Sequence, residues 1–212
     1  MGELRDYEQW HQAYDDPDSA MSWRLSVVRR YLTEALAARS GPVRLLSLCA
    51  GDGRDVVGVL GSRADARRVA ATLVELHPVI AENARRDAAA AGLDRVEVRT
   101  AVAGTAEAYA DAVPADIVLL VGIFGNITDD DLIRTVRAAP QLCTPGARLV
   151  WSRGRHLTDP NDRIRGWFSD AGFAELDYAT REGDGQPALG CVRYDGQPTR
   201  LEPTARLFTF VR

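Results

Sequence analysis

Two glycines and one acidic residue form the pattern in this sequence that points most directly to chemistry. Gly51 and Gly53 follow an apolar run in the stretch LLSLCAGDGRD, and Glu75 stands 22 residues beyond Gly53. Glycines at a strand-to-helix turn let a ligand approach the backbone, whose free N–H groups attract anionic groups. An acidic side chain about 20 residues later can accept hydrogen bonds from both hydroxyls of a ribose. The pattern predicts a nucleoside-binding site.

The turn departs from the dinucleotide-binding pattern at its third glycine position, which is occupied by Val56. A glycine at that point allows the close helix–strand packing behind a pyrophosphate, so Val56 disfavours NAD or FAD as the ligand. A pair of glycines alone also fits a tight connection that binds nothing. The prediction therefore depends on the glycines and Glu75 together.

A doubly wound sheet would position these residues. From Gly41 onward, short apolar runs alternate with helical patterns, which is typical of parallel strands joined by crossover helices. The expected parallel strands are 43–48, 69–75, 96–100, 116–121 and 147–151. The expected helices are 79–91, 129–138 and a segment around 163–170. Later runs at 173–179, 189–194 and 207–211 are separated by Gly/Pro-rich turns and predict antiparallel strands at one edge. The expected fold class is α/β, a Rossmann-like, mostly parallel sheet with an antiparallel C-terminal edge.

Residues 1–40 are expected to form an N-terminal helical cap, and residues 41–212 the α/β domain. Apolar residues recur at helical spacing between Met21 and Leu36, so this helix should rest on the sheet. Before it, one helical face would carry the side chains of Tyr7, Trp10, His11 and Tyr14. Such an aromatic stripe is typical of core packing, and the alternative is a lid over a pocket.

Composition excludes several kinds of chemistry. The 26 basic residues are all Arg, so a Schiff-base lysine, a phosphate-binding P-loop lysine and a lysine general base are absent. The net charge is −4, with both signs interspersed, and this distribution disfavours nucleic acid as a partner. Three scattered cysteines and three histidines do not have the spacing of a metal site.

Targeting signals are not evident in the sequence. The N-terminus is polar, and the longest apolar run, residues 117–125, is about half the length that spans a bilayer. We therefore expect a cytoplasmic protein that binds no membrane. The edge strand or the cap offers a surface for a homodimer.

Three segments together resemble the class I S-adenosylmethionine-dependent methyltransferases. LLSLCAGDGRD is similar to the glycine-rich first motif of that superfamily, ATLVELHP to its acidic second-strand motif, and PADIVLLVGIFGNIT to its fourth-strand motif. The resemblance extends from about Pro42 to the C-terminus and is strongest to small bacterial members with an N-terminal helical cap. It implies a methyltransferase that uses S-adenosylmethionine (SAM) and leaves S-adenosylhomocysteine (SAH).

The resemblance also implies roles for individual residues. The implied cofactor contacts are Cys49, Ala50, Gly51, Asp52, Gly53 and Asp55 at the glycine motif, Glu75 on the ribose, Leu76 on the adenine, and Gly122 and Ile123 near the sulfonium. Tyr14 would lie close to the methionine carboxylate, with Arg24 as an ionic partner.

Two positions differ from the superfamily pattern. Ser47 stands where the first motif usually begins with an acidic residue, and Val102 stands where an Asp usually accepts the adenine amino group. Backbone groups near Ala103 and Gly104 are the expected replacement for that Asp. The loss of one such hydrogen bond costs on the order of 1 kcal/mol, so binding should be weakened rather than abolished.

The acceptor should bind at the tips of the fourth and fifth strands and under the cap. The predicted substrate-binding residues are Trp10, His11, Phe124, Asn126, Arg153 and His156, and the predicted catalytic residues are His11, Tyr14, Asn126 and Arg153. Arg153 could hold a carboxylate in bidentate fashion. A histidine could remove a proton near neutral pH. The acidic run 129–131 is assigned to helix capping, not to a metal.

Transfer of a methyl group to a small molecule is the leading prediction, and two others stay open. SAM could instead donate its aminocarboxypropyl chain, because the fold alone does not choose the leaving group. The protein could also bind the cofactor without catalysis.

Overall fold

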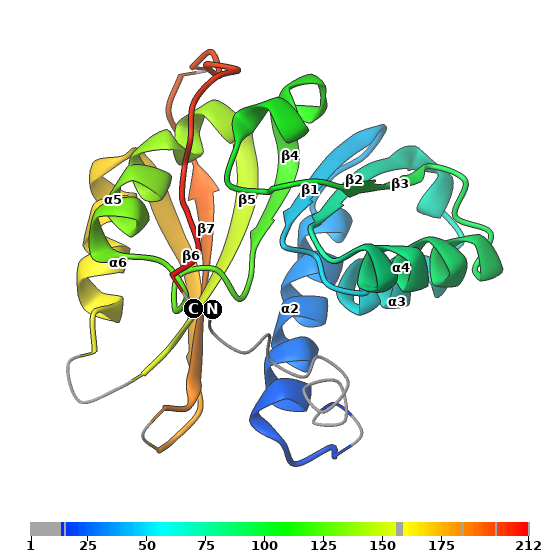
Figure 1. Ribbon diagram of the computed structural model, residues 1–212, viewed down its shortest axis with the longest axis horizontal. Helices are drawn as coiled ribbons and strands as arrows, with labels where there is room; N and C mark the ends of the chain where they lie inside the picture. Colours follow the sequence, from blue (N-terminus) through cyan, green and yellow to red (C-terminus); the bar gives the residue numbers. More distant parts are fainter. Residues whose placement is uncertain (1–13, 15, 156–158, 184, 198, 212) are drawn as a thin grey trace.

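One mixed sheet crosses the part of the chain that the computed structural model describes, which is residues 14, 16–155, 159–183, 185–197 and 199–211 (Figure 1). Its strand order is β3-β2-β1-β4-β5-β7-β6. The strands are β1 (Val43–Leu48), β2 (Val69–Glu75), β3 (Val96–Thr100), β4 (Ala115–Leu120), β5 (Cys143–Gly154), β6 (Phe173–Thr180) and β7 (Pro187–Tyr194). This arrangement confirms the predicted α/β class.

The sheet has a parallel part and an antiparallel part. Strands β1 to β5 pair in parallel, whereas β7 lies antiparallel between β5 and β6. The strand order reverses between β1 and β4, and in such sheets ligands bind beyond the carboxyl ends of the strands at this reversal. We call the side where β1 to β5 end the carboxyl edge; it faces downward in Figure 1.

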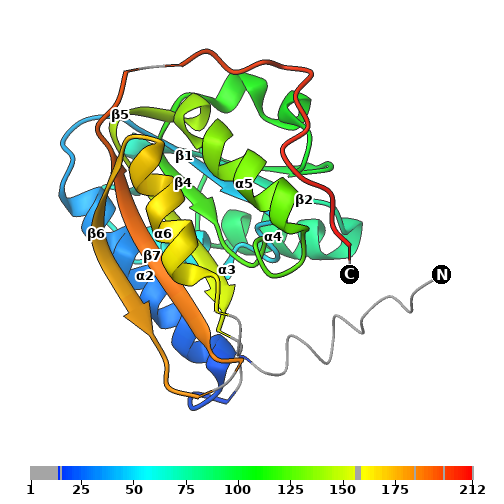
Figure 2. The ribbon, with the colours of Figure 1, turned by 90° about the vertical axis from the view of Figure 1, so that its left-hand side faces the viewer.

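Helices cover both faces of the sheet (Figures 1 and 2). One face carries α2 (Ala20–Ala37), α3 (Arg54–Gly61) and α4 (Pro78–Ala90), and the other carries α5 (Asp129–Ala138) and α6 (Asn161–Asp170). Short 3-10 turns are η1 (Ala66–Arg68), η2 (Ala106–Ala108), η3 (Ala110–Ala112) and η4 (Ala139–Leu142). Among the described residues, no helix is long and apolar enough to cross a membrane.

The helix α2 packs directly on the sheet. Ser19 caps its first turn by accepting a hydrogen bond from the backbone N–H of Ser22 at 3.0 Å. Tyr31 and Leu32 are fully buried, in the same apolar cluster as Val150 of β5. The predicted apolar face of this segment therefore packs as expected. The aromatic stripe that precedes Tyr14 lies outside the described residues, and the division into cap and domain stays a prediction.

Local sequence signals account for most element boundaries. The ranges predicted for the first three strands match β1, β2 and β3, and α5 begins where Thr128 accepts a hydrogen bond from Asp131 N–H at 3.2 Å. The three aspartates of its first turn occupy the capping region as predicted. Strand β4 begins and ends one residue earlier than expected, and β5 is longer at both ends.

The prediction of a last strand at 207–211 is wrong. Residues 205–211, here called the C-terminal strap, run outside the sheet, with one isolated bridge between Thr105 and Arg206. Leu207 N–H donates to the carbonyl of Gly104 at 2.8 Å, so the strap follows the loop after β3. In Figure 1 it descends in red across the face that carries α5 and ends towards the carboxyl edge. Two of its apolar residues, Leu207 and Phe208, are buried in the core cluster that includes residues of α5, and the strap does not extend the sheet.

Candidate functional site

The glycine loop, residues 49–53, leaves β1 at the carboxyl edge in an unusual backbone conformation. Cys49, Gly51 and Gly53 have φ angles of 56°, 61° and 68°, all in the left-handed region that favours glycine. Gly53 is also the N-cap of α3, and as a glycine it has no side chain that could cap the helix itself. The loop therefore turns sharply into α3, where Arg54 N–H donates to Asp52 Oδ1 at 3.2 Å and Val56 N–H donates to Asp55 Oδ1 at 2.7 Å.

The two glycines face different surroundings. Among the described residues, a Cβ atom at Gly51 would meet nothing within 4 Å, so the described part of the chain leaves this position open. A Cβ atom at Gly53 would lie 2.7 Å from Cδ2 of Leu73, a fully buried residue of β2. Gly51 thus leaves room for a ligand, while Gly53 allows α3 to approach the sheet.

Glu75 joins the ends of two strands at this edge. Its Oε2 accepts from Gly51 N–H at 2.9 Å, and its Oε1 accepts from His77 N–H at 2.8 Å. Each carboxylate oxygen has a second lone pair, so the same side chain can still accept hydrogen bonds from two hydroxyl groups. The spacing noticed in the sequence does bring Glu75 to the glycine loop.

Exposed apolar side chains lie next to Glu75. Leu76 follows β2 and is 59% exposed, and Val102 follows β3 and is 52% exposed. Large apolar side chains at this exposure are the kind of surface that an aromatic ligand covers. Of the two residues expected to replace the missing Asp, Ala103 is buried and the carbonyl of Gly104 already accepts from Leu207.

Tyr14 and Arg24 meet on the opposite side of the glycine loop. The guanidinium of Arg24 donates to the hydroxyl of Tyr14 at 3.0 Å and lies 4.0 Å from where a Cβ atom of Gly122 would be. Burial raises the pKa of Tyr14, so its hydroxyl stays protonated at neutral pH. The two residues that were expected at the methionine carboxylate thus lie together beside the loop that follows β4, and their contact with the cofactor stays a prediction.

Arg54, which the sequence analysis missed, completes this side. Its guanidinium stacks 4.0 Å from the centroid of the Tyr14 ring, and its Nε donates to Asp52 Oδ1 at 3.0 Å. No local signal could have indicated the Tyr14 contact, because the two residues are 40 positions apart.

Two titratable groups of the predicted site, the Asp55 carboxyl and the Cys49 thiol, have raised pKa values. Burial raises the pKa of Asp55, whose Oδ1 accepts from Val56 N–H at 2.7 Å. Burial, reinforced by the charge of Glu75, raises the pKa of the Cys49 thiol well above its usual range. A thiol with a raised pKa is a poor nucleophile at neutral pH, which argues against covalent catalysis by Cys49.

The loop after β4 is held by side chains of β5 and by one of the loop's own residues, Asn126. Ser152 of β5 is buried, and its Oγ accepts from Gly122 N–H at 2.9 Å. Asn126 Nδ2 donates to the carbonyl of Gly122 at 2.8 Å. Arg153 donates from Nη1 to the carbonyl of Phe124. Asn126 and Arg153 therefore position this loop, and their contact with an acceptor stays a prediction.

Two predicted ligand contacts are core residues in the structure. Ile123 and Phe124 are fully buried, and the Phe124 ring lies 6.0 Å from that of Trp151 and 6.3 Å from that of Phe168. The Phe124 side chain packs in this aromatic cluster and the Ile123 side chain is buried in the same core, while their contacts with acceptor and cofactor stay predictions. The predicted acceptor residues Trp10, His11 and His156 lie outside the described residues.

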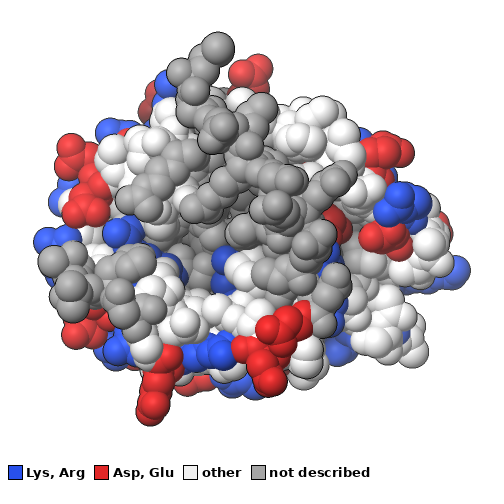
Figure 3. Space-filling view, turned by 60° about the horizontal axis from the view of Figure 1, so that its bottom comes forward, with Lys and Arg blue, Asp and Glu red and all other residues white. Residues whose placement is uncertain are grey.

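Charges of both signs are mixed on the face seen in Figure 3. Within the described ranges, no group of three or more His, Cys, Asp or Glu residues could hold a metal ion. The arrangement as a whole is a backbone turn open at Gly51, a carboxylate, an apolar surface and an arginine, all around the ends of β1, β2 and β4. These groups suit a ligand with hydroxyl, aromatic and anionic parts.

Comparison with known proteins identifies the fold. The chain matches no protein-family model and no curated protein sequence. An O-methyltransferase family protein from Burkholderia thailandensis superposes on 90% of the chain, with a TM-score of 0.65 and 19% identity. Magnesium protoporphyrin IX methyltransferase from Synechocystis PCC 6803 with bound SAH superposes on 89% of it, with a TM-score of 0.66 and 10% identity. The chain has the class I methyltransferase fold.

The lengths of these methyltransferases differ from that of the chain. The chain spans 60% of the Burkholderia protein and 93% of the Synechocystis enzyme, which has also been solved with bound SAM. The apo form of the SAM-dependent methyltransferase SibL superposes on 84% of the chain with a TM-score of 0.56 and 20% identity, and the chain spans 57% of it. In this chain, the reversal of strand order between β1 and β4 lies at the candidate site.

Proposed function

We propose that this protein is a SAM-dependent methyltransferase that acts on a small-molecule acceptor. The observation that carries the proposal is the pairing of Glu75 with the open Gly51 at the β1/β4 reversal. A buried strand end, a left-handed turn and a bidentate carboxylate acceptor are the features that a nucleoside requires. The structures solved with bound SAM and SAH share this fold and support the choice of cofactor.

The residues present fit the parts of SAM. Glu75 would accept hydrogen bonds from the ribose hydroxyls, and the exposed Leu76 and Val102 would cover the adenine. Arg24 and Tyr14 would hold the methionine carboxylate, because a guanidinium binds a carboxylate well in a partly buried site. The buried Val56 stands against a dinucleotide at the same turn.

The mechanism relies on positioning more than on acid–base chemistry. When bound, SAM would supply a methyl group activated by its sulfonium, and SAH would be the leaving group when that methyl passes in line to the acceptor nucleophile. Ser152 accepts a hydrogen bond from the N–H of Gly122, and Asn126 donates one to its carbonyl. The two side chains thus hold the loop that would face the methionyl part of the cofactor. Arg153 holds the backbone of Phe124 and thereby the same loop.

A small acceptor is favoured over a nucleic acid. The described residues around the grey area of Figure 3 mix Arg with Asp and Glu, whereas a nucleic-acid site presents a continuous positive surface. The chain carries 30 acidic and 26 basic residues, which favours a neutral or mildly charged acceptor.

Calorimetric titration with SAM, SAH and NADH tests the cofactor. We expect micromolar binding of SAM and SAH and none of NADH; binding of NADH alone would overturn the proposal. Incubation with SAM labelled in its methyl group and a panel of phenols, amines and thiols then tests the reaction. Methylated acceptor with SAH supports the proposal, whereas methylthioadenosine would indicate use of the aminocarboxypropyl chain and a bound, unreacted cofactor would indicate a binding protein.

A further inference from the structure

Exposed apolar side chains concentrate at the carboxyl edge. Among the described residues, the large apolar side chains that are exposed are Leu76, Val79, Val102, Leu176, Phe210 and Val211. Leu76 follows β2, Val79 lies in the first turn of α4, and Val102 follows β3. Phe210 and Val211 lie at the end of the C-terminal strap. Only Leu176, on the edge strand β6, lies away from the ends of the central strands. An apolar surface gathered at one edge indicates a binding site.

The two groups at this edge have different roles. The group after β2 and β3 lies beside Glu75 and is accounted for by the adenine of the proposed cofactor. Phe210 and Val211 are 41% and 58% exposed, and nothing in the proposed cofactor contacts accounts for them.

The strap is fixed in position by hydrogen bonds at several points. Thr209 N–H donates to Asp131 Oδ2 at 2.8 Å, and Val211 N–H donates to the carbonyl of Asn126 at 2.9 Å. Earlier in the strap, Phe208 is buried and its carbonyl lies where a Cβ atom of Gly104 would be. These contacts hold the end of the strap against the β4–α5 loop.

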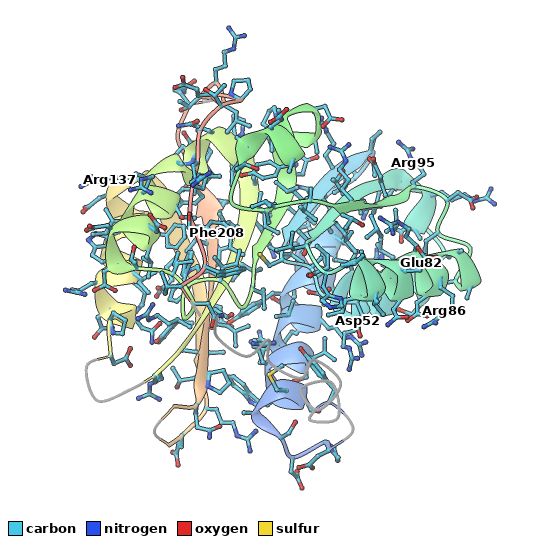
Figure 4. The ribbon with its side chains drawn as sticks, in the orientation of Figure 1. Asp52, Glu82, Arg86, Arg95, Arg137 and Phe208 are labelled. Atoms are coloured by element: carbon cyan, nitrogen blue, oxygen red, sulfur yellow. The ribbon has the colours of Figure 1, made fainter. Side chains whose placement is uncertain are left out.

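Buried and exposed residues separate along the strap. Leu207 and Phe208 belong to the core, whereas the Phe210 ring, 5.5 Å from that of Phe208, extends the same apolar surface outward. Figure 4 labels Phe208 on the strap, and Asp52 below the ends of the strands, where α3 begins. The strap thus carries an apolar surface from the core to the carboxyl edge.

The exposed end is close to the loop that the mechanism uses. Val211 is hydrogen-bonded to Asn126, and Asn126 in turn to the carbonyl of Gly122. Gly122 is the residue whose N–H is held by Ser152 at the end of β5. Two hydrogen bonds therefore connect the strap to the point where cofactor and acceptor would meet.

We propose that Phe210 and Val211 form an apolar wall of the acceptor site, so that the acceptor carries an apolar body next to its nucleophile. This inference rests on the proposed function and adds the chemical class of the acceptor. The wall selects by burial: each methylene group that leaves water against it raises affinity about threefold to fourfold.

A series of phenols measures the wall directly. The full chain, saturated with SAH, is titrated by calorimetry with phenol, 4-ethylphenol and 4-butylphenol. Wild-type affinity should rise along the series by at least tenfold. In Phe210→Ala and in the Phe210→Ala, Val211→Ala double variant, most of that rise should disappear while SAH binds as before. Leu176→Ala, which removes an equally exposed apolar side chain from β6, should behave as wild type.

Each outcome decides the proposal. If affinity rises along the phenol series as much in the double variant as in wild type, the proposed apolar wall is wrong. It is also wrong if 4-butylphenol shows no saturable binding to wild type. Failure of wild type to bind SAH, measured before any phenol is added, overturns the proposed function itself. Thermal unfolding of each variant verifies that the fold is intact, and the single Val211→Ala variant gives an independent measurement if the double variant unfolds.

Discussion

Glu75 and Gly51 are joined by a hydrogen bond of 2.9 Å between a side-chain carboxylate and a backbone N–H. The bond ties the end of β2 to the turn that leaves β1, and it uses only one lone pair of Oε2. Glu75 can therefore shape the glycine loop and still accept hydrogen bonds from a ligand. This double use makes it the most informative residue to substitute.

Replacement of Glu75 by Ala should weaken SAH binding by about 10- to 100-fold, because charge-assisted hydrogen bonds to two hydroxyls are lost. Calorimetric titration measures the change. Glu82→Ala is the matched control: Glu82 is an exposed carboxylate on α4, paired with Arg85 and labelled in Figure 4, so its loss should leave affinity unchanged. Equal affinities for all three proteins would remove Glu75 from the site.

Alanine substitutions at Gly51 and Gly53 separate the cost of backbone strain from the cost of side-chain overpacking. Gly51 and Gly53 have nearly the same φ, so an added methyl group strains both to a similar degree, about 1–2 kcal/mol. Only at Gly53 does the new Cβ also meet Leu73, which adds about 1–3 kcal/mol of overpacking. Urea denaturation should therefore show a larger loss for Gly53→Ala than for Gly51→Ala. The reverse order would contradict the packing described here.

Larger substitution at Gly51 tests the ligand. Gly51→Val places a branched side chain in the open space over the turn and should abolish SAH binding. Circular dichroism establishes that the variant is folded. A folded Gly51→Val protein that still binds SAH would show that the turn is only structural.

Arg24 should contribute to binding of the methionine part of the cofactor and not of its nucleoside part. Arg24→Gln removes the charge beside Tyr14 and Gly122, so SAH affinity should fall by about tenfold, as expected for a lost charge-assisted bond. Methylthioadenosine lacks the amino acid part, and its affinity should stay constant. Arg30→Gln, on an exposed face of the same helix, is the control. A parallel loss for both ligands would mean that Arg24 holds the fold and not the carboxylate.

Acid should weaken the ion pair between Arg99 of β3 and Asp111 of the turn η3, which we call the clamp. Arg99 donates to both oxygens of Asp111 and lowers the pKa of Asp111 to about 2. Because the folded pKa lies below the ordinary value near 4, the clamp stabilises the protein above that value and is lost as the pH falls from about 4 to about 2. The pair is exposed, so its contribution is at most about 1 kcal/mol.

The difference in unfolding free energy between wild type and Asp111→Asn measures this clamp. It should be largest at neutral pH, shrink as the pH falls below about 4 and approach zero only below about pH 2, where Asp111 becomes protonated in wild type as well. Glu107→Gln, an exposed carboxylate on the neighbouring turn η2, should show no such dependence. A difference that persists unchanged at low pH would contradict the assigned cause.

Local pattern was sufficient for the central part of the fold. The strands β1, β2 and β3 are short apolar runs between turn residues, and their predicted ranges match. The glycines lie in the turn after β1 and Glu75 is the last residue of β2, so the topology of a parallel sheet was enough to bring them to one edge. The capped start of α5 at Thr128 is likewise a signal contained in a few neighbouring residues.

Contacts between distant segments required the tertiary structure. The run 207–211 has the composition of a strand, but its N–H groups donate to Gly104, Asp131 and Asn126 instead of to a strand edge. Ser152 and Gly122 are 30 positions apart, and neither residue type identifies the other as its partner.

The sequence by itself therefore determined the order of the elements, the glycine turn and the acidic residue that faces it. Only the tertiary structure decided the path of the strap, the burial of Phe124 and the stacking of Arg54 on Tyr14. The physical reason is that periodicity and turn chemistry act over a few residues, whereas the partner of an apolar run or a guanidinium depends on which surfaces the whole fold leaves open.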